Sequence, residues 1–419
     1  MNIDPNVILI VLSAIVLLSY FFNILSRWSR IPSVLLLIGT GIILQDVSRT
    51  VGVYFESVSP LVQLVGTIGL IMIVLEASLE LNFSRQKIRL ILSAFFSALL
   101  ILLFSVFIVS WILCVALEQS FVRCLPYAVA LSIVSSAIVI PSVSHLNSDK
   151  KEFIIYESSF SDILGIILFN FLTLEKGPSV LAGLEFIGTL FLVIVISIIT
   201  SFILFFMLAK IRDHIRIFLL FAILILLYAS AKVYHLPSLI LILAFGIIIN
   251  KLVEYKPIKQ YFGIEVITHV HGQLHHMTAE TAFLIRTFFF ILFGYSISLG
   301  AFSEVRTYSV GVIITGSLLA IRYFYLRFFL KSRILPELFL MPRGLITVLL
   351  LYSLPPNHQL GNFNEGIVLF VILSSSLLML VGLWSYTGGK LNEDSLTSIE
   401  QTYAAKGDLE EIKSNDLAK

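Results

Sequence analysis

The residue of this sequence with the clearest chemical potential is Asp162. It lies about ten residues into a predicted membrane span of about twenty residues, 153–173, so its carboxyl group is placed near the bilayer midplane. An ionisable group at that depth costs several kcal/mol and is by default a functional candidate. Desolvation disfavours the charged form, so the group can hold a proton, or release it and hold a monovalent cation, but not both. We therefore predict that a proton and a cation compete for Asp162; a neutral, hydrogen-bonded structural aspartate is the alternative.

Oxygen ligands for such a cation are predicted beside Asp162. Ser161 directly precedes it, and Ser135 and Ser136 lie at a similar depth in the preceding span, 126–147. Pro141 cannot donate a hydrogen bond to the carbonyl of Ala137. A carbonyl freed in this way within a membrane is tolerated only beside a cavity, a ligand or protein. The alternative is a kinked helix whose hydroxyls bond the preceding turn.

A second pair of charges is predicted to be structural. Glu157 lies about five residues from the cytoplasmic end of its span, and Arg322 lies about eight residues from the cytoplasmic end of the span 308–330. A lone buried charge is costly, whereas a hydrogen-bonded pair is tolerable, so we expect these two side chains to pair. The alternative is that each reaches separately to the cytoplasmic interface.

Three further charges have open interpretations. Glu76 ends one span and Arg286 begins another, both near the cytoplasmic face, so they line a funnel, meet each other, or anchor their helices at the interface. Arg343 stands in Pro342-Arg343-Gly344, where it caps helix ends or braces irregular backbone, or acts as a simple anchor.

Histidines cluster in the predicted loop 251–280, at positions 269, 271, 275 and 276. Such a cluster suggests a metal site or a pH sensor. Because no cysteine lies near them in the sequence, an amphipathic surface helix that carries titrating histidines is the favoured interpretation for His269, His271, His275 and His276. No cofactor is predicted.

The composition identifies the elements that position these residues. Hydrophobic residues make up 58% of the 419 residues and charged residues only 13%, compared with about 25% charged in soluble domains. Backbone polar groups must be paired within lipid, and the long apolar runs lack period-2 polarity, so helices are predicted rather than a barrel. A net charge of +2 gives no indication of a nucleic-acid partner.

We therefore predict an all-α polytopic membrane protein with about 13 transmembrane helices. The first apolar segment is interpreted as a retained helix, because it lacks the features of a cleaved signal peptide. Lysine and arginine are concentrated in one set of alternate loops, which places the N-terminus outside and the C-terminus in the cytoplasm of a cell-membrane protein. The expected spans are 7–25, 32–46, 59–78, 89–117, 126–147, 153–173, 183–209, 215–232, 237–250, 281–303, 308–330, 335–355 and 364–386.

An odd number of spans divides into two sets of six with a linker helix between them. The sets begin on opposite sides of the membrane, which is the arrangement of an inverted repeat in secondary transporters. We predict a transmembrane domain over 1–388, with repeat one at about 1–175, the linker helix at about 183–209 and repeat two at about 215–386. The remaining residues, 389–419, are predicted to form a polar cytoplasmic tail.

At these residues the chain resembles the cation/proton antiporter superfamily, and most closely its NhaP-like and sodium/proton exchanger branch. The Glu-x-x-x-Asn-Asp pattern of that family is similar to Glu157 through Asp162, with Ser161 in place of the asparagine. A buried family arginine resembles Arg322, and an Arg-Gly helix start resembles Arg343-Gly344. The phenylalanine-rich segment that ends at Phe293-Gly294 is also similar.

The resemblance implies an elevator transporter and a homodimer of two-domain protomers. It assigns Asp162 as the transport carboxylate, the Glu157–Arg322 pair as structural, and the spans 126–147 and 335–355 as two crossed broken helices. Where the family has Thr-Asp-Pro, this chain has Ser135-Ser136-Ala137, and it also lacks the paired Asp-Asp of electrogenic relatives. One titrating carboxylate therefore predicts electroneutral exchange of one Na⁺, K⁺ or Li⁺ for one H⁺.

Three alternatives to sodium/proton antiport are open. A K⁺/H⁺ antiporter or K⁺ efflux relative would be favoured by a selectivity-filter motif or a nucleotide-binding domain, and neither is visible in the sequence. An organic-anion symporter of the same fold would require a basic or polar site in place of a midplane carboxylate. A membrane-embedded enzyme would require a nucleophile with its base or a metal set, and no HExxH or GxSxG pattern occurs.

Overall fold

The predicted all-α fold is confirmed. A computed structural model describes residues 5–29, 31–51, 59–80, 87–143, 146, 148–174, 180–210, 216–234, 236–254, 264–296, 305–330 and 335–385. Within these ranges the secondary structure is helical, without a strand. The predicted tail, 389–419, lies outside the described residues.

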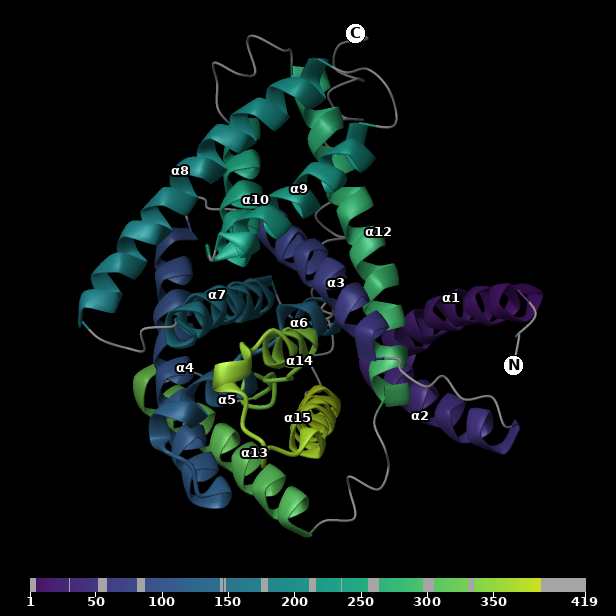
Figure 1. Cartoon of the computed structure of the whole chain (residues 1–419), viewed down its shortest axis with the longest axis vertical. Helices are drawn as coiled ribbons and strands as arrows, with labels where there is room; N and C mark the ends of the chain where they lie inside the picture. The colour runs from purple at the N-terminus through teal and green to yellow at the C-terminus, as the bar shows by residue number, and fades with distance from the viewer. Residues whose placement is uncertain are drawn as a thin grey trace, which may run out of the picture.

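The helices form two groups, which are visible as two clusters in Figure 1. The core group contains α4 (Ile88–Leu117), α5 (Phe121–Ser132), α6 (Ser136–Ser142), α7 (Ser148–Leu172), α13 (Val305–Tyr325), α14 (Leu345–Tyr352) and α15 (Glu365–Ser385). The scaffold group contains α1 (Pro5–Ser29), α2 (Ser33–Val51), α3 (Ser59–Glu80), α8 (Val180–Lys210), α9 (Arg216–Val233), α10 (Ser238–Glu254) and α12 (Ile264–Ser296). The two groups meet where α3 packs on α6 and α14, and where α10 packs on α7.

Two interrupted segments meet inside the core group, where α6 and α14 lie in the middle of the cluster in Figure 1. The first segment is α5 and α6, which are separated by the extended residues 133–135. The second is the non-helical stretch 340–344, which leads into α14. The backbone N–H of Ser135 donates to the carbonyl of Pro342 at 2.9 Å, which pairs two groups that no helix satisfies.

A glycine permits this close approach. A Cβ atom at Gly344 would lie 2.8 Å from both the Ser135 hydroxyl oxygen and the Ile138 side chain. Gly344 is therefore the residue that lets the second interrupted segment pack against the first.

Hydropathy identifies most of the predicted spans. Six helical segments of the described chain are long and apolar enough to cross a membrane: 88–117, 121–142, 183–204, 272–296, 305–330 and 365–385. Shorter apolar stretches lie at 12–25, 33–48, 64–79, 218–233 and 238–252. The other two predicted spans correspond to α7, whose first half is rich in charge, and α14, which has 8 residues.

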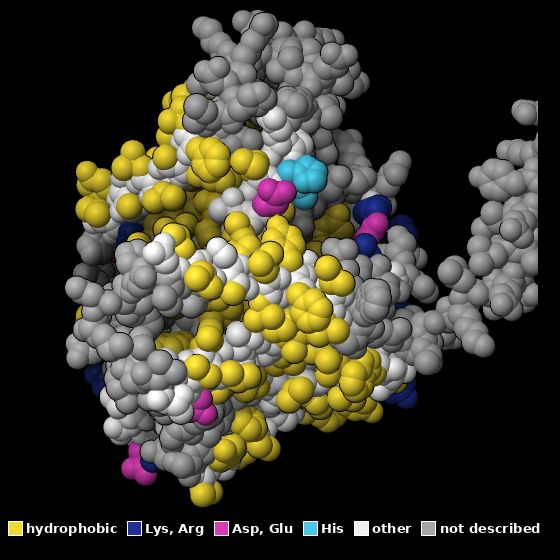
Figure 2. Space-filling model, turned by 90° about the vertical axis from the view of Figure 1, so that its right-hand side faces the viewer, with side chains coloured by type: hydrophobic (Ala, Val, Ile, Leu, Met, Phe, Trp, Pro, Cys, Tyr) yellow, Lys and Arg dark blue, Asp and Glu magenta, His cyan; other side chains and the backbone are white. Residues whose placement is uncertain are grey.

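The outer surface suits lipid contact. Large apolar side chains such as Phe107, Trp111 and Phe191 are more than half exposed, and yellow hydrophobic side chains cover much of the face in Figure 2. The chain is therefore a multi-pass membrane protein.

The span 335–355 is interrupted, as the resemblance implies: it contains a turn at 335–339 and one short helix, α14, because Pro342 and Gly344 interrupt regular hydrogen bonding. One predicted element is wrong. The histidine-bearing segment is not a separate surface helix: α12 runs without interruption from Ile264 to Ser296 and includes all four histidines. No proline occurs between these residues, so the polar first half continues the same helix.

Candidate functional site

Asp162 lies on α7 beside the break between α5 and α6, and its side chain is only 3% exposed. Its carboxylate oxygen Oδ2 accepts a hydrogen bond from the backbone N–H of Ser136 at 3.1 Å and another from the Ser136 hydroxyl at 2.5 Å. Ser136 is the first residue of α6, so its N–H has no partner within the helix. The break in the helix thus supplies two donors to the carboxylate.

Asp162 differs from the other buried carboxylates of the described residues. Glu157 pairs with Arg322 at 2.6 Å, and Glu337 pairs with Lys150 at 2.7 Å. No lysine, arginine or histidine within the described ranges pairs with Asp162, and its second oxygen, Oδ1, accepts no hydrogen bond from them. One oxygen of Asp162 therefore remains for a proton or a cation.

The predicted hydroxyl ligands have different surroundings. The Ser161 hydroxyl accepts a hydrogen bond from the backbone N–H of Val134 at 2.9 Å, so it also contacts the break. The Ser135 hydroxyl is buried and has no hydrogen-bond partner among the described residues. The structure thus brings Ser136 into direct contact with Asp162 and places Ser161 and Ser135 beside the same three-residue break.

Arg343 caps the other side of this break. Its guanidinium donates to the carbonyls of Leu131 and Ser132 at 3.0 and 3.1 Å, and to that of Met341 at 2.5 Å. Leu131 and Ser132 end α5, where carbonyls lack helical partners and the helix dipole is negative. The α5 end of the break therefore carries a buried positive charge, and the α6 end faces the Asp162 carboxylate.

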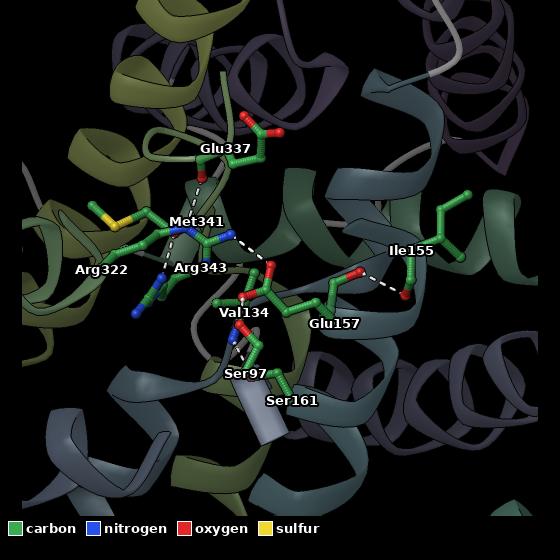
Figure 3. A network of polar contacts seen from close by, with 10 residues as sticks. Ser97, Val134, Ile155, Glu157, Ser161, Arg322, Glu337, Met341 and Arg343 are labelled. Carbon is green, nitrogen blue, oxygen red and sulfur yellow. Dashed lines mark hydrogen bonds and ion pairs between the residues drawn. The ribbon is translucent and has the colours of Figure 1, made fainter. Parts of the chain in front are cut away.

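Glu157 and Arg322 form the centre of a buried polar network, shown in Figure 3. Their side chains are 3% and 1% exposed and lie 2.6 Å apart. Ser97 donates to the other Glu157 oxygen at 3.1 Å, and Arg322 donates to the carbonyl of Glu337 at 2.7 Å. The network joins α4, α7, α13 and the turn before α14.

Glu76 and Arg286 also meet, at 2.9 Å. Arg286 additionally donates to the carbonyl of Ala137 at 3.0 Å. This is the carbonyl that Pro141 leaves without a helical donor.

A cavity of about 140 Å³ lies at this contact, with Glu76, Arg286, Ser136 and Pro141 in its wall. Glu76 and Arg286 also line a larger neighbouring cavity of about 730 Å³. Asp162 is not part of either wall. Ser136 lines the smaller cavity and donates two hydrogen bonds to the Asp162 carboxylate, so this residue connects the cavity wall to the acid.

Two contributors were not found from the sequence. Ser97 lies in the middle of the apolar helix α4, and the turn residue Glu337 accepts from Arg322 through its backbone. The sequence signal is weak: Ser97 is one of four serines in the mostly apolar helix α4, and its position does not identify a partner 60 residues away. No group of three or more metal-ligating side chains occurs in the described part of the chain.

Residues 11–384 match the sodium/hydrogen exchanger transmembrane family. The chain belongs to this family. The solved structures that it resembles include the sodium proton antiporter MjNhaP1 from Methanocaldococcus jannaschii at pH 8. The two share 16% sequence identity over 90% of this chain and 96% of that one, with a TM-score of 0.66. A map of the same antiporter from electron microscopy gives 15% identity over 93% and 99% of the two chains, with a TM-score of 0.65.

Comparison with curated proteins gives no match. At these identities the likeness to MjNhaP1 concerns the fold, whereas the family match concerns the sequence. Membership of the sodium/hydrogen exchanger family confirms the predicted resemblance and supports cation/proton antiport.

Proposed function

We propose that this member of the sodium/hydrogen exchanger family exchanges one Na⁺ for one H⁺, with both ions competing for Asp162. The observation that carries the proposal is that Asp162 is the buried carboxylate without a basic partner in the described residues. A buried carboxylate must be neutralised. A proton or a monovalent cation at the available Oδ1 oxygen achieves this, and binding of one excludes the other.

The surrounding groups favour a hard cation. Hydroxyl, carboxylate and carbonyl oxygens are the ligands available at the break, and thiolates or imidazoles are not present there. Asp162, Ser136, Ser161 and Ser135 are the proposed ligands. Such oxygens also suit K⁺ and Li⁺, so K⁺/H⁺ antiport is the second candidate, favoured by the presence of Ser136 where the family often has a second acid.

The charge balance supports electroneutral exchange. Glu76 and Glu157 are each paired with an arginine, so neither contributes an unbalanced charge beside the site. With one titrating carboxylate, one cation moves inward for each proton that moves outward, or the reverse, and no net charge crosses the membrane.

The two helix groups suit an elevator mechanism. The carboxylate, the break and the Arg343 cap all belong to the core group, so they can move as one body against the scaffold group. We place the cavity beside Ser136 on the cytoplasmic side, with the N-terminus outside, and the scaffold group at the contact of a homodimer.

The test is exchange in proteoliposomes that contain a pH-sensitive dye. Addition of external Na⁺ is expected to raise internal pH at the same rate whether or not a potassium–valinomycin voltage of about 100 mV is imposed; such a voltage supplies about 2.3 kcal/mol per net charge moved. A rate that changes severalfold with voltage would contradict one-for-one exchange. Exchange with K⁺ but not Na⁺ would support the second candidate.

A further inference from the structure

Arg286 makes a polar contact between the two helix groups beside the candidate site. It lies on α12 of the scaffold group and pairs with Glu76 on α3 of the same group at 2.9 Å. Its second guanidinium nitrogen donates to the carbonyl of Ala137 at 3.0 Å, and Ala137 lies on α6 of the core group. Arg286 thus holds scaffold and core together with one planar side chain.

The sequence explains why Ala137 can accept this bond. Residue 141 is proline, so no N–H lies four residues on to bond the Ala137 carbonyl. A buried carbonyl without a donor is destabilising, and a charged donor provides a strong partner. Ala137 directly follows Ser136, whose N–H and hydroxyl bond Asp162. The contact is therefore one residue from the proposed proton and cation site.

This contact depends on how the groups are arranged. Glu76 and Arg286 both belong to the scaffold group, so their ion pair is kept when the core group moves. The bond to Ala137 crosses the boundary and must break. We infer that Arg286 is a positioning residue. Its bond to Ala137 holds α6 in the arrangement in which the cavity beside Ser136 is open. This inference rests on the proposed function, because it takes the core group to be the moving part.

Glu76 has a complementary role. It neutralises the guanidinium, so Arg286 can approach the cation path without placing a net positive charge in the cavity wall. Arginine suits both tasks, since its planar fork reaches a carboxylate and a carbonyl together, whereas a lysine offers a point charge.

The test measures access to the cavity and does not require transport. Ile140 lines the cavity, so Ile140→Cys is introduced into the full chain with the free thiols Cys114 and Cys124 replaced by serine. We expect Arg286→Gln to slow labelling of that cysteine by a small thiol reagent by about threefold or more. The variant loses the bond to the Ala137 carbonyl, which is made only in the open arrangement, so the open arrangement becomes less populated. Arg89→Gln, at an exposed arginine of α4, is the matched control and is expected to leave the rate unchanged.

A labelling rate that is unchanged or faster in Arg286→Gln overturns the inference. If that variant does not fold, Arg286→Lys decides: we expect a rate between wild type and glutamine, and a wild-type rate would overturn the inference. Labelling is independent of ion exchange. If Arg286→Gln slows labelling but the wild-type protein does not exchange Na⁺, the role of Arg286 stands and the proposed function is rejected. If the wild-type protein exchanges Na⁺ but Arg286→Gln does not slow labelling, only the role of Arg286 is rejected.

Discussion

Asp162→Asn is expected to abolish exchange while the protein still folds. Asparagine keeps the size of the side chain and can still accept the two Ser136 bonds, but it cannot take up the proton or neutralise a cation. A buried cation without a counter-charge costs about 3 kcal/mol or more, which corresponds to an affinity loss of about 100-fold or more. Sodium-driven proton movement in proteoliposomes is the measurement.

The control for this variant is Asp46→Asn, at an exposed aspartate of α2 outside the core group. It is expected to exchange at the wild-type rate. Retained exchange in Asp162→Asn, at wild-type cation affinity, would remove Asp162 from the mechanism altogether.

The second large effect is expected on stability. Arg322→Gln leaves the Glu157 carboxylate buried with only the Ser97 hydroxyl to stabilise its charge. Breaking a buried ion pair from one side is expected to destabilise the fold by about 3–5 kcal/mol. The readout is the temperature at which half of the detergent-solubilised protein remains monodisperse after heating.

A double variant separates the lost pair from the unpaired charge. Glu157→Gln combined with Arg322→Gln removes both charges and is expected to be more stable than Arg322→Gln alone, because no uncompensated charge remains. Arg327→Gln, at a residue of the short helix η3 (Leu326–Leu330) that is not buried, provides the matched control. If Arg322→Gln unfolded at the same temperature as this control, the pair would have no structural role.

The sequence predicted the fold class well because lipid leaves few structural options. Long apolar runs predict the positions of most helices. Of the charged residues singled out in the sequence, Glu157, Asp162, Arg322 and Arg343 lie in the core group, whereas Glu76 and Arg286 lie in the scaffold group. Pro141 indicated a freed carbonyl at Ala137, and the structure identifies the donor as Arg286. The predicted start of the span 281–303 is wrong because no proline between Ile264 and that span stops the helix, so α12 already begins at Ile264.

The partners of the predicted residues were less accessible. The depth of Ser136 in its span indicates a candidate ligand, but its position at the start of α6 depends on a helix break that Pro141 alone does not locate. Ser97 and the Glu337 carbonyl enter the Glu157–Arg322 network from other helices. Such contacts depend on how elements pack, and neither periodicity nor hydropathy within one segment specifies them.

The most direct test of competition at Asp162 is the number of protons released when purified protein binds Na⁺. Titration calorimetry in buffers of different ionisation enthalpy measures this number without a membrane or a voltage. At a pH where the carboxyl group is protonated, we predict about one proton released for each Na⁺ bound, as expected for a single shared site. Na⁺ binding without proton release, or equal release from Asp162→Asn, would contradict the proposal that the two ions compete for this carboxylate.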